Sequence, residues 1–226
     1  MSVQSDRRFL ISHSDPMSPE ASLYRGLRTR IENFPGGRER RTIAITSAEP
    51  LEGKTTTATN LAIAYAQSGC NTLLIDGNGY RPVLNRLFGI HDDIGLADMV
   101  RSNRPLGDAA KETEIPGLSL LAYGAVQMPF QGLAADRLES VLDQAKGAYD
   151  IVLIDTPALL SVPDTGVFAA SSDGVLLVIH STLTNRTNAL ACKKQLEQLG
   201  ASILGCVHNS AKPMPAKGYR HYTSAR

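Results

Sequence analysis

The stretch SAEPLEGKTT at residues 47–56 decides the fold of this chain. It follows the apolar run 43–45 and precedes a helical pattern, so a strand turns through a loop of small residues into a helix. In such a turn, backbone N–H groups and the positive end of the new helix face a bound phosphate. Lys54 adds a positive charge there, and the Thr55 hydroxyl is placed to hold Mg²⁺. The first glycine of the usual G-x-x-x-x-G-K-[ST] pattern is Ala48, so the stretch predicts a nucleotide phosphate site with an imperfect motif.

The composition is that of one ordinary globular domain. The chain has 226 residues, of which 42% are hydrophobic and 20% charged, so it can bury a sizeable core. A net charge of +1 creates no overall field for nucleic acid, and we expect no nucleic-acid partner. The three cysteines lie far apart without a C-x-x-C, which argues against a disulfide framework or a metal cluster. We find no stretch typical of a signal peptide or a membrane span, and therefore expect a cytoplasmic protein.

Strand and helix signals alternate from Arg41 onward. Short runs rich in Ile, Val and Leu predict strands at 42–46, 72–76, 118–122, 150–155, 174–180 and 202–207, with helices between them at 54–68, 133–147 and 186–199. Continuous apolar strands separated by helices indicate a mostly parallel sheet with helices on both faces. The predicted fold is α/β and P-loop NTPase-like, with its ligand at the carboxyl ends of the strands.

The two ends of the chain differ from this central region. Residues 1–17 are polar and irregular, and we expect a flexible N-terminal arm there. Ser18 followed by Pro and Glu is typical of a helix start, and apolar residues at helical spacing predict a helix over 18–34. We therefore place the main domain at 18–211 and a flexible tail at 212–226, where periodicity is lost.

Two acids complete the predicted site. Asp155 ends the buried strand 150–155, where it could orient Mg²⁺ through water beside the phosphate loop. The alternative role is to cap the turn that follows the strand. Asp76 ends the strand 72–76 in the same way. Two strand-end acids facing one phosphate loop indicate metal-assisted phosphoryl transfer or hydrolysis.

These motifs together resemble those of the bacterial tyrosine kinases of polysaccharide export (BY-kinases of the CapB/CpsD type), from Ser18 to about Ser210. The family's phosphate loop, S-x-x-P-G-E-G-K-[ST]-T, is similar to residues 47–56. Its second motif, L-L-I-D-x-D-x-R-x-P, is matched in part by residues 73–82. Its third, Y-D-x-V-I-I-D-T-P-P, is similar to residues 149–157. The combination is specific, although each motif alone is weak.

The resemblance implies an ATP-dependent protein-tyrosine (auto)kinase that regulates capsular or exopolysaccharide synthesis and export, with ATP and Mg²⁺ as cofactors. The implied residues are Glu52, Gly53, Lys54, Thr55, Thr56 and Asn209 for ATP binding, with Asn209 on the adenine; Lys54, Asp76 and Asp155 for catalysis; and Thr55, Asp76 and Asp155 for the metal.

The resemblance also implies partners. Arg25 and Arg28 resemble the family's E-x-x-R-x-x-R assembly element, which implies a homo-oligomer. Tyr219 and Tyr222 in the tail would be the phosphate acceptors. Because we find no membrane span, the resemblance implies a separate transmembrane activator of the polysaccharide co-polymerase type. That activator would recruit this protein to the inner face of the membrane.

Four positions depart from the family's motifs. Asn78 replaces the second Asp of the second motif, and an amide can position a substrate hydroxyl but cannot take its proton. Leu51 replaces a loop glycine, which costs about 1 kcal/mol or more if the position needs a positive φ. Tyr80 stands at a usually basic position, and Ser22 at the Glu of the assembly element.

Two other functions remain open. A catalytically weak or inactive ATP-binding partner in the same pathway is favoured by Asn78, Leu51 and Ser22. A MinD/ParA-like ATPase would share the fold, but those proteins carry a signature lysine five residues before the loop lysine, where this chain has Glu49. An acid cannot replace that phosphate contact.

Overall fold

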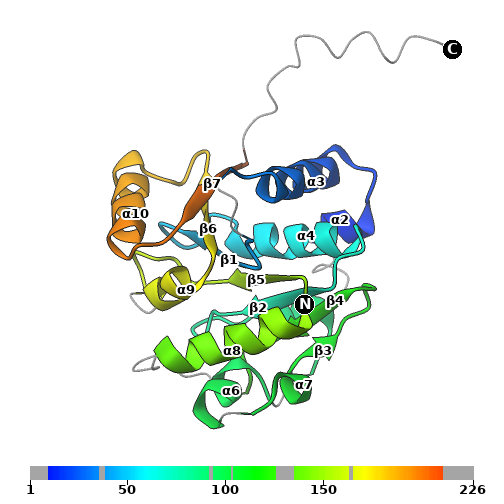
Figure 1. Ribbon diagram of the computed structural model, residues 1–226. Coiled ribbons are helices and arrows are strands. Elements are labelled where there is room, and N and C mark those ends of the chain that lie inside the picture. Colours follow the sequence, from blue (N-terminus) through cyan, green and yellow to red (C-terminus); the bar gives the residue numbers. More distant parts are fainter. Residues whose placement is uncertain are drawn as a thin grey trace, which may run out of the picture.

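The computed structural model describes residues 10–35, 39–91, 94–102, 104–125, 135–162 and 165–210. Over these ranges the strands form one sheet in the order β3-β4-β2-β5-β1-β6-β7 (Figure 1). All pairings are parallel except the short β3–β4 pair. The predicted mostly parallel sheet is confirmed. Its strands are β1 Thr42–Ser47, β2 Thr72–Asp76, β3 Lys111–Glu112, β4 Leu118–Leu121, β5 Ile151–Asp155, β6 Gly174–His180 and β7 Ile203–Asn209.

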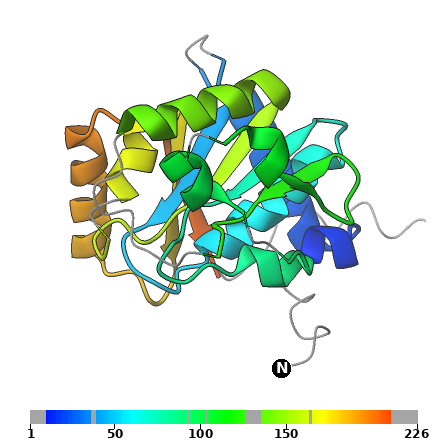
Figure 2. The ribbon, with the colours of Figure 1, turned by 90° about the horizontal axis from the view of Figure 1, so that it is seen from below.

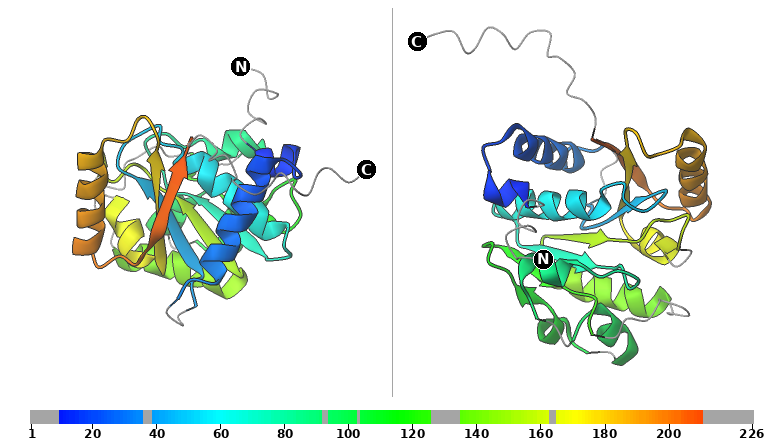
Figure 3. Two further views of the ribbon diagram at one scale, coloured as in Figure 1. Left: turned by 90° about the horizontal axis from the view of Figure 1, so that it is seen from above. Right: turned by 180° about the vertical axis from the view of Figure 1, so that it is seen from behind.

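Helices cover both faces of this sheet, as predicted. In β6, Leu176 and Val178 belong to the apolar cluster around α4, whereas Val175 and Leu177 pack in the cluster that includes Cys192 of α10. Figures 1 and 2 show α3 and α4 on one side and α6, α7 and α8 on the other, and Figure 3 shows α10 beside β6 and β7. The helices are α2 Ile11–Ser14, α3 Pro19–Glu32, α4 Lys54–Ala66, α5 Leu84–Phe88, α6 Leu96–Ser102, α7 Leu106–Ala109, α8 Ala135–Ala148, α9 Thr165–Ser171 and α10 Arg186–Gln198.

The N-terminal segment packs against the domain earlier than the sequence predicts. Leu10 is buried in the core, and residues 11–14 form the short helix α2. The Ser12 N–H donates to Oδ1 of Asn60 at 2.8 Å, and Gln67 Nε2 donates to the Ser12 carbonyl at 2.7 Å. The expectation of a flexible arm over 1–17 is therefore wrong for residues 10–14, because polar contacts to α4 hold them. Residues 1–9 lie outside the described ranges.

Helix α3 starts where the sequence predicts. The Ser18 side chain accepts a hydrogen bond from the Ala21 N–H at 3.2 Å, and Pro19 occupies the first helical position. Ala21 and Ile31 are its buried residues, so most of the helix surface is left outside the core. Helix α3 packs on α4, the helix that follows the phosphate loop.

Candidate nucleotide site

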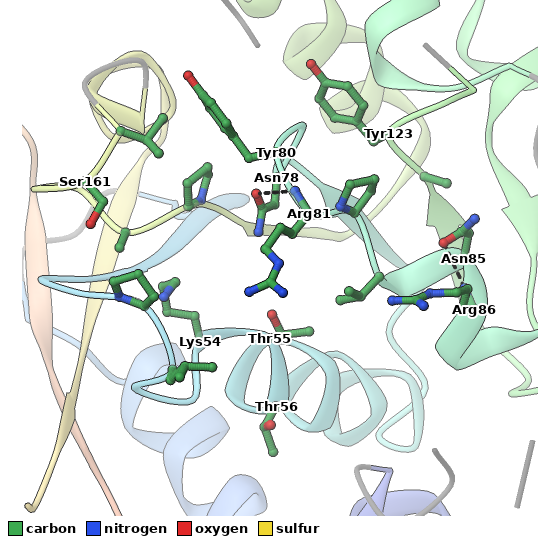
Figure 4. Close-up of a pocket in the computed structure, with 18 of the residues that line it drawn as sticks. Lys54, Thr55, Thr56, Asn78, Tyr80, Arg81, Asn85, Arg86, Tyr123 and Ser161 are labelled. Carbon is green, nitrogen blue, oxygen red and sulfur yellow. Dashed lines mark hydrogen bonds between the residues drawn. The ribbon is translucent and has the colours of Figure 1, made fainter. Parts of the chain in front are cut away.

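A cavity of about 860 Å³ opens at the carboxyl ends of the central strands (Figure 4). One side of it is the loop between β1 and α4 together with the first residues of α4. The facing side is the turn after β2 and the start of α5, and the segments that follow β4 and β5 complete the wall. The position agrees with the predicted ligand site of a parallel α/β sheet. The lining falls in the ranges 50–56, 78–86, 122–125 and 157–162.

Lys54 and Thr55 begin α4 at this cavity, as the phosphate-loop pattern predicts. Lys54 Nζ donates to Ser47 Oγ at 2.8 Å and to the Glu49 carbonyl at 3.3 Å. Burial lowers the pKa of Lys54, while the charge of Asp155 opposes that shift. The ammonium group is therefore held against the loop instead of being free in solvent.

Gly53, just before α4, is required by both backbone and packing. Its φ of 96° lies in the left-handed region, and a Cβ there would come within 1.9 Å of Asn209 Nδ2. The same Asn209 nitrogen donates to the Glu52 carbonyl at 3.0 Å. The end of β7 thus closes directly onto the phosphate loop.

The side chain of Glu52 holds the phosphate loop in place, and the predicted ATP contact of this residue stays a prediction. Its side chain is fully buried and does not line the cavity. It accepts hydrogen bonds from Thr184 Oγ1 at 2.5 Å and from the Glu49 N–H at 3.2 Å. The side chain therefore positions the loop by tying it to the segment before α10. Asn209 also lies outside the cavity lining, and its adenine contact stays a prediction.

Asp155 carries an unsatisfied oxygen beside Thr55. The Thr55 hydroxyl donates to Asp155 Oδ2 at 2.7 Å, whereas the buried Oδ1 has no hydrogen-bond partner among the described residues. Burial, and next the charge of Asp76, raise the pKa of Asp155 to about 7. A hydroxyl beside an unpartnered buried carboxylate oxygen suits Mg²⁺, which prefers oxygen ligands. Within the described ranges, no group of three or more His, Cys, Asp or Glu side chains is arranged to hold a metal ion.

Asp76 lies opposite Asp155 in the parallel register of β2 and β5, so the structure brings the two acids together. Its Oδ1 accepts from the Asn78 N–H at 3.0 Å, and its Oδ2 from the N–H groups of Val83 and Leu84 at 3.0 and 3.1 Å. Burial raises the pKa of Asp76 to about 6, and these three bonds oppose the shift. Asp76 is therefore the anchor of the turn that follows it.

That turn contains residues that the sequence analysis did not assign to the site. Asn78 Oδ1 accepts from the Arg81 N–H at 3.2 Å, which fixes the turn internally. Gly79 packs against Tyr123, because a Cβ at Gly79 would lie 2.2 Å from the Tyr123 ring. Arg81 and Tyr123 line the cavity (Figure 4). In the sequence, Arg81 shows only as a basic residue next to Tyr80, which is a weak signal.

The remaining predicted residues are placed as follows. Thr56 lines the cavity with Lys54 and Thr55. Arg25 donates to the Pro16 carbonyl at 2.5 Å. Arg28 donates to the Ala64 carbonyl at 3.0 Å and pairs with Glu32, so both arginines make bonds within the chain. Their role in self-association stays a prediction, and Tyr219 and Tyr222 lie outside the described residues.

Leu51 adopts the backbone conformation that the missing glycine suggested. Its φ is 65°, and its side chain is 80% exposed at the cavity. A leucine in this region is strained, because its Cβ crowds the backbone carbonyl. The loop therefore keeps the shape that glycine would allow and carries the strain of a side chain.

Within the described ranges, no helix has the length and apolar character needed to cross a membrane.

Comparisons with known proteins agree with this fold. Residues 40–199 match a family model described as an AAA domain. The chain is 32% identical to the tyrosine-protein kinase YwqD of Bacillus subtilis over 96% of this chain and 92% of the relative. The solved structure of the chimerical protein CapA2B2 superposes with a TM-score of 0.84 at 32% identity, covering 91% of each chain. The septum site-determining protein MinD of Pyrococcus horikoshii, solved with Mg-ADP, gives a TM-score of 0.65 at 29% identity over 74% of this chain and 69% of that one.

Proposed function

This chain belongs to the family of bacterial tyrosine kinases, and we propose that it is an ATP-dependent protein-tyrosine (auto)kinase that regulates capsular or exopolysaccharide synthesis and export. The observation that carries the proposal is that Lys54 and Thr55 line one cavity, while Asp155, buried behind the cavity wall, accepts a hydrogen bond from the Thr55 hydroxyl. A loop lysine, a hydroxyl at a helix start and an unpartnered buried carboxylate oxygen are together suited to Mg·ATP.

Mg²⁺ would be held by Thr55 and Asp155, with Asp76 behind them, and would neutralise charge on the β- and γ-phosphates. The orphaned Oδ1 of Asp155 supports this assignment, because an unpaired buried carboxylate is unfavourable without a cation. Lys54 would contact the phosphates from the loop side, where its bonds to Ser47 and Glu49 already hold it.

The transfer itself asks little of a general base. The bond from the tyrosine oxygen to the γ-phosphorus forms, the bond from that phosphorus to the β–γ bridging oxygen breaks, and ADP leaves with the electron pair. Phosphoryl transfer has a loose transition state. In it, the bond from the attacking oxygen to phosphorus is only slightly formed when the bond to the leaving group is largely broken. The phenol proton, with a pKa of about 10, can therefore pass to water. Asn78 would position the hydroxyl without accepting its proton.

The acceptors in this proposal are Tyr219 and Tyr222 of a neighbouring copy. Self-association would use α3 with Arg25 and Arg28, as the family resemblance implies. The same resemblance supports a transmembrane activator of the polysaccharide co-polymerase type, which would bring the protein to the inner face of the membrane.

Two alternative functions each have one specific observation in their favour. The fold likeness to MinD supports a positioning ATPase. However, the signature lysine is replaced by Glu49, whose carboxylate accepts from Asn188 Nδ2 at 2.7 Å. The amide of Asn78 favours an ATP-binding partner that lacks catalysis.

Intact mass after incubation with Mg·ATP separates these functions. The protein would be tested alone at high concentration and with the cytoplasmic segment of its activator, with tryptic mapping of the tail and Lys54→Ala as control. Phosphate on Tyr219 or Tyr222 that is lost in Lys54→Ala supports the kinase. Unmodified protein that binds ATP supports the non-catalytic partner, and ATP hydrolysis without phosphotyrosine supports the MinD-like ATPase.

A further inference from the structure

Besides Lys54, the cavity lining contains two cationic side chains that the motifs do not assign, Arg81 and Arg86. Arg81 lines it from the turn after β2, and Figure 4 shows its guanidinium pointing into the cavity, toward Thr55. Its backbone N–H bonds to Asn78, but among the described residues its guanidinium makes neither a hydrogen bond nor an ion pair. Lys54, by contrast, already donates to Ser47 and to the Glu49 carbonyl.

The backbone that presents Arg81 is fixed from three directions. Asp76 accepts from the N–H groups of the turn at Asn78, Val83 and Leu84. Asn78 accepts from the Arg81 N–H, so the amide that cannot act as a base still holds the turn. Gly79 lies against the buried Tyr123 ring, so this side of the turn has no room to move inward. An arginine on such a frame loses less freedom on binding than one on a loose loop.

The electrostatics of the cavity favour an anion in front of Arg81. The acids of the site, Asp76 and Asp155, are both fully buried behind the wall and do not line the cavity. Pro50, Leu51 and Gly53 on the facing loop carry no charge. A planar guanidinium with five donors, and with no partner in the part of the chain that the structure describes, matches the oxygens of a phosphate, which it can bind in a bidentate way.

We propose that Arg81 binds the terminal phosphate of ATP and stabilises the negative charge that spreads over its oxygens during transfer. This inference rests on the proposed function, since it deepens the same nucleotide site. Lys54 would then contact the phosphates from the α4 side and Arg81 from the opposite wall. A cation placed in this way acts by preorganised electrostatics, and it needs no proton transfer.

The test compares Arg81→Ala with Arg81→Lys and with Arg104→Ala, which removes the same charge from an exposed position outside the cavity lining. Binding of Mg·ATP and Mg·ADP would be measured by calorimetry, and thermal unfolding would show that each variant is folded. We expect Arg81→Ala to weaken ATP binding by about 10- to 100-fold, the usual effect of a charge-assisted bond, and ADP binding much less. Arg81→Lys keeps the positive charge but loses the planar, bidentate guanidinium, so its ATP affinity should lie between those of Arg81→Ala and the unmodified chain.

Equal ATP affinity in Arg81→Ala and the unmodified chain would overturn the inference and leave the proposed function standing. Equal losses for ATP and ADP would also overturn it, because a ligand of the terminal phosphate must discriminate between them. If the unmodified chain binds neither nucleotide, the proposed function fails as well. If Arg81→Ala does not fold, Arg81→Lys replaces it in the test. An ATP-to-ADP affinity ratio equal to that of the unmodified chain would then overturn the inference, and a lower ratio would support it.

Discussion

The phosphate loop at 47–56 and the turn at 77–84 face one cavity but are built in opposite ways. In the loop, the side chains of Glu52 and Lys54 are buried and bonded to neighbouring protein groups. In the turn, one buried acid before it, Asp76, holds the backbone. The side chains of the turn are left to face the cavity. Substitutions in the loop should therefore change stability and binding together, whereas substitutions of the side chains in the turn should change nucleotide binding or the reaction with little effect on stability.

The departures from the family's motifs fit this contrast. Leu51 keeps the backbone shape of the loop, with a φ of 65°. Asn78 keeps the oxygen that accepts from Arg81 in the turn. Each of these two residues preserves the local backbone and changes only the side chain that faces the nucleotide site. Substitutions in the loop and in the turn can therefore both test the contrast between the two segments.

The largest effect is expected at Glu52. Glu52→Ala leaves the Thr184 hydroxyl and the Glu49 N–H without their buried partner, and should lower the free energy of unfolding by about 3 kcal/mol. Glu49→Ala is the matched control on the same loop. It removes only the half-buried bond from Asn188 and should change the free energy by less than about 1 kcal/mol. Urea unfolding measures both, and similar losses for the two variants would contradict the positioning role of Glu52.

The next effect concerns the buried acid behind the loop. The pKa of Asp155 is raised to about 7 in the folded chain, above the value of about 3.9 in an unfolded one. Between these pH values the folded state holds more protons, so its stability falls as pH rises. Asp155→Asn removes this dependence and should raise the melting temperature without Mg²⁺ by roughly 5 °C at pH 8.

The gain from Asp155→Asn should disappear near pH 3, about one pH unit below the unfolded pKa, where the carboxyl is mostly protonated in both states. Asp143→Asn, at a 70% exposed side chain, serves as control and should show neither effect. Thermal unfolding at both pH values checks the prediction. A gain of equal size at pH 3 and pH 8 would show that the pKa of Asp155 is not raised.

On the side of the turn, Asn78→Asp should raise the rate of tyrosine phosphorylation by about 10-fold. The carboxylate keeps the oxygen that accepts from Arg81 and adds a group that can take the phenol proton. Asn85→Asp adds the same charge to the same cavity wall and should bring no gain. The rate is followed by mass spectrometry of the tail. Equal rates for the two variants would mean that a base at residue 78 does not limit the reaction.

The smallest effect is expected at Leu51. Leu51→Gly relieves the left-handed backbone strain, and because glycine also gains freedom in the unfolded chain, the net stabilisation should be about 0.5–1 kcal/mol. Leu51→Ala retains the strain and should bring no gain. Urea unfolding checks both, and a stabilising Leu51→Ala would assign the effect to the exposed side chain instead.

The fold was predictable because its main elements repeat a simple pattern. The strands at 72–76 and 174–180 have the predicted bounds, since continuous Ile, Val and Leu runs mark buried parallel strands. The helices α5, α6, α7 and α9 span four to seven residues each, too short for an amphipathic period, and they were missed.

The site was predictable only where one local stretch contains it. Lys54 and Thr55 follow from the loop motif, and Asp76 and Asp155 from strand ends. The bond from Thr184 to the carboxylate of Glu52 was not predicted, because the two residues are 132 positions apart in the chain. Contacts of this kind, like the one between Gly79 and Tyr123, depend on tertiary packing that no spacing reveals.

The closure of β7 onto the phosphate loop also sets when this site can exist during synthesis. Asn209 bonds to Glu52 across 157 residues of chain, and Thr184 does so across 132. A chain made from its N-terminus therefore completes the loop sequence early, but must wait for nearly its whole length before the loop has its partners. Contacts between residues so far apart in the chain also slow folding, because the chain loses entropy in closing the long loop before the contact can stabilise it. A nascent chain cut short before β7 would carry the whole motif and still lack the packing that shapes it.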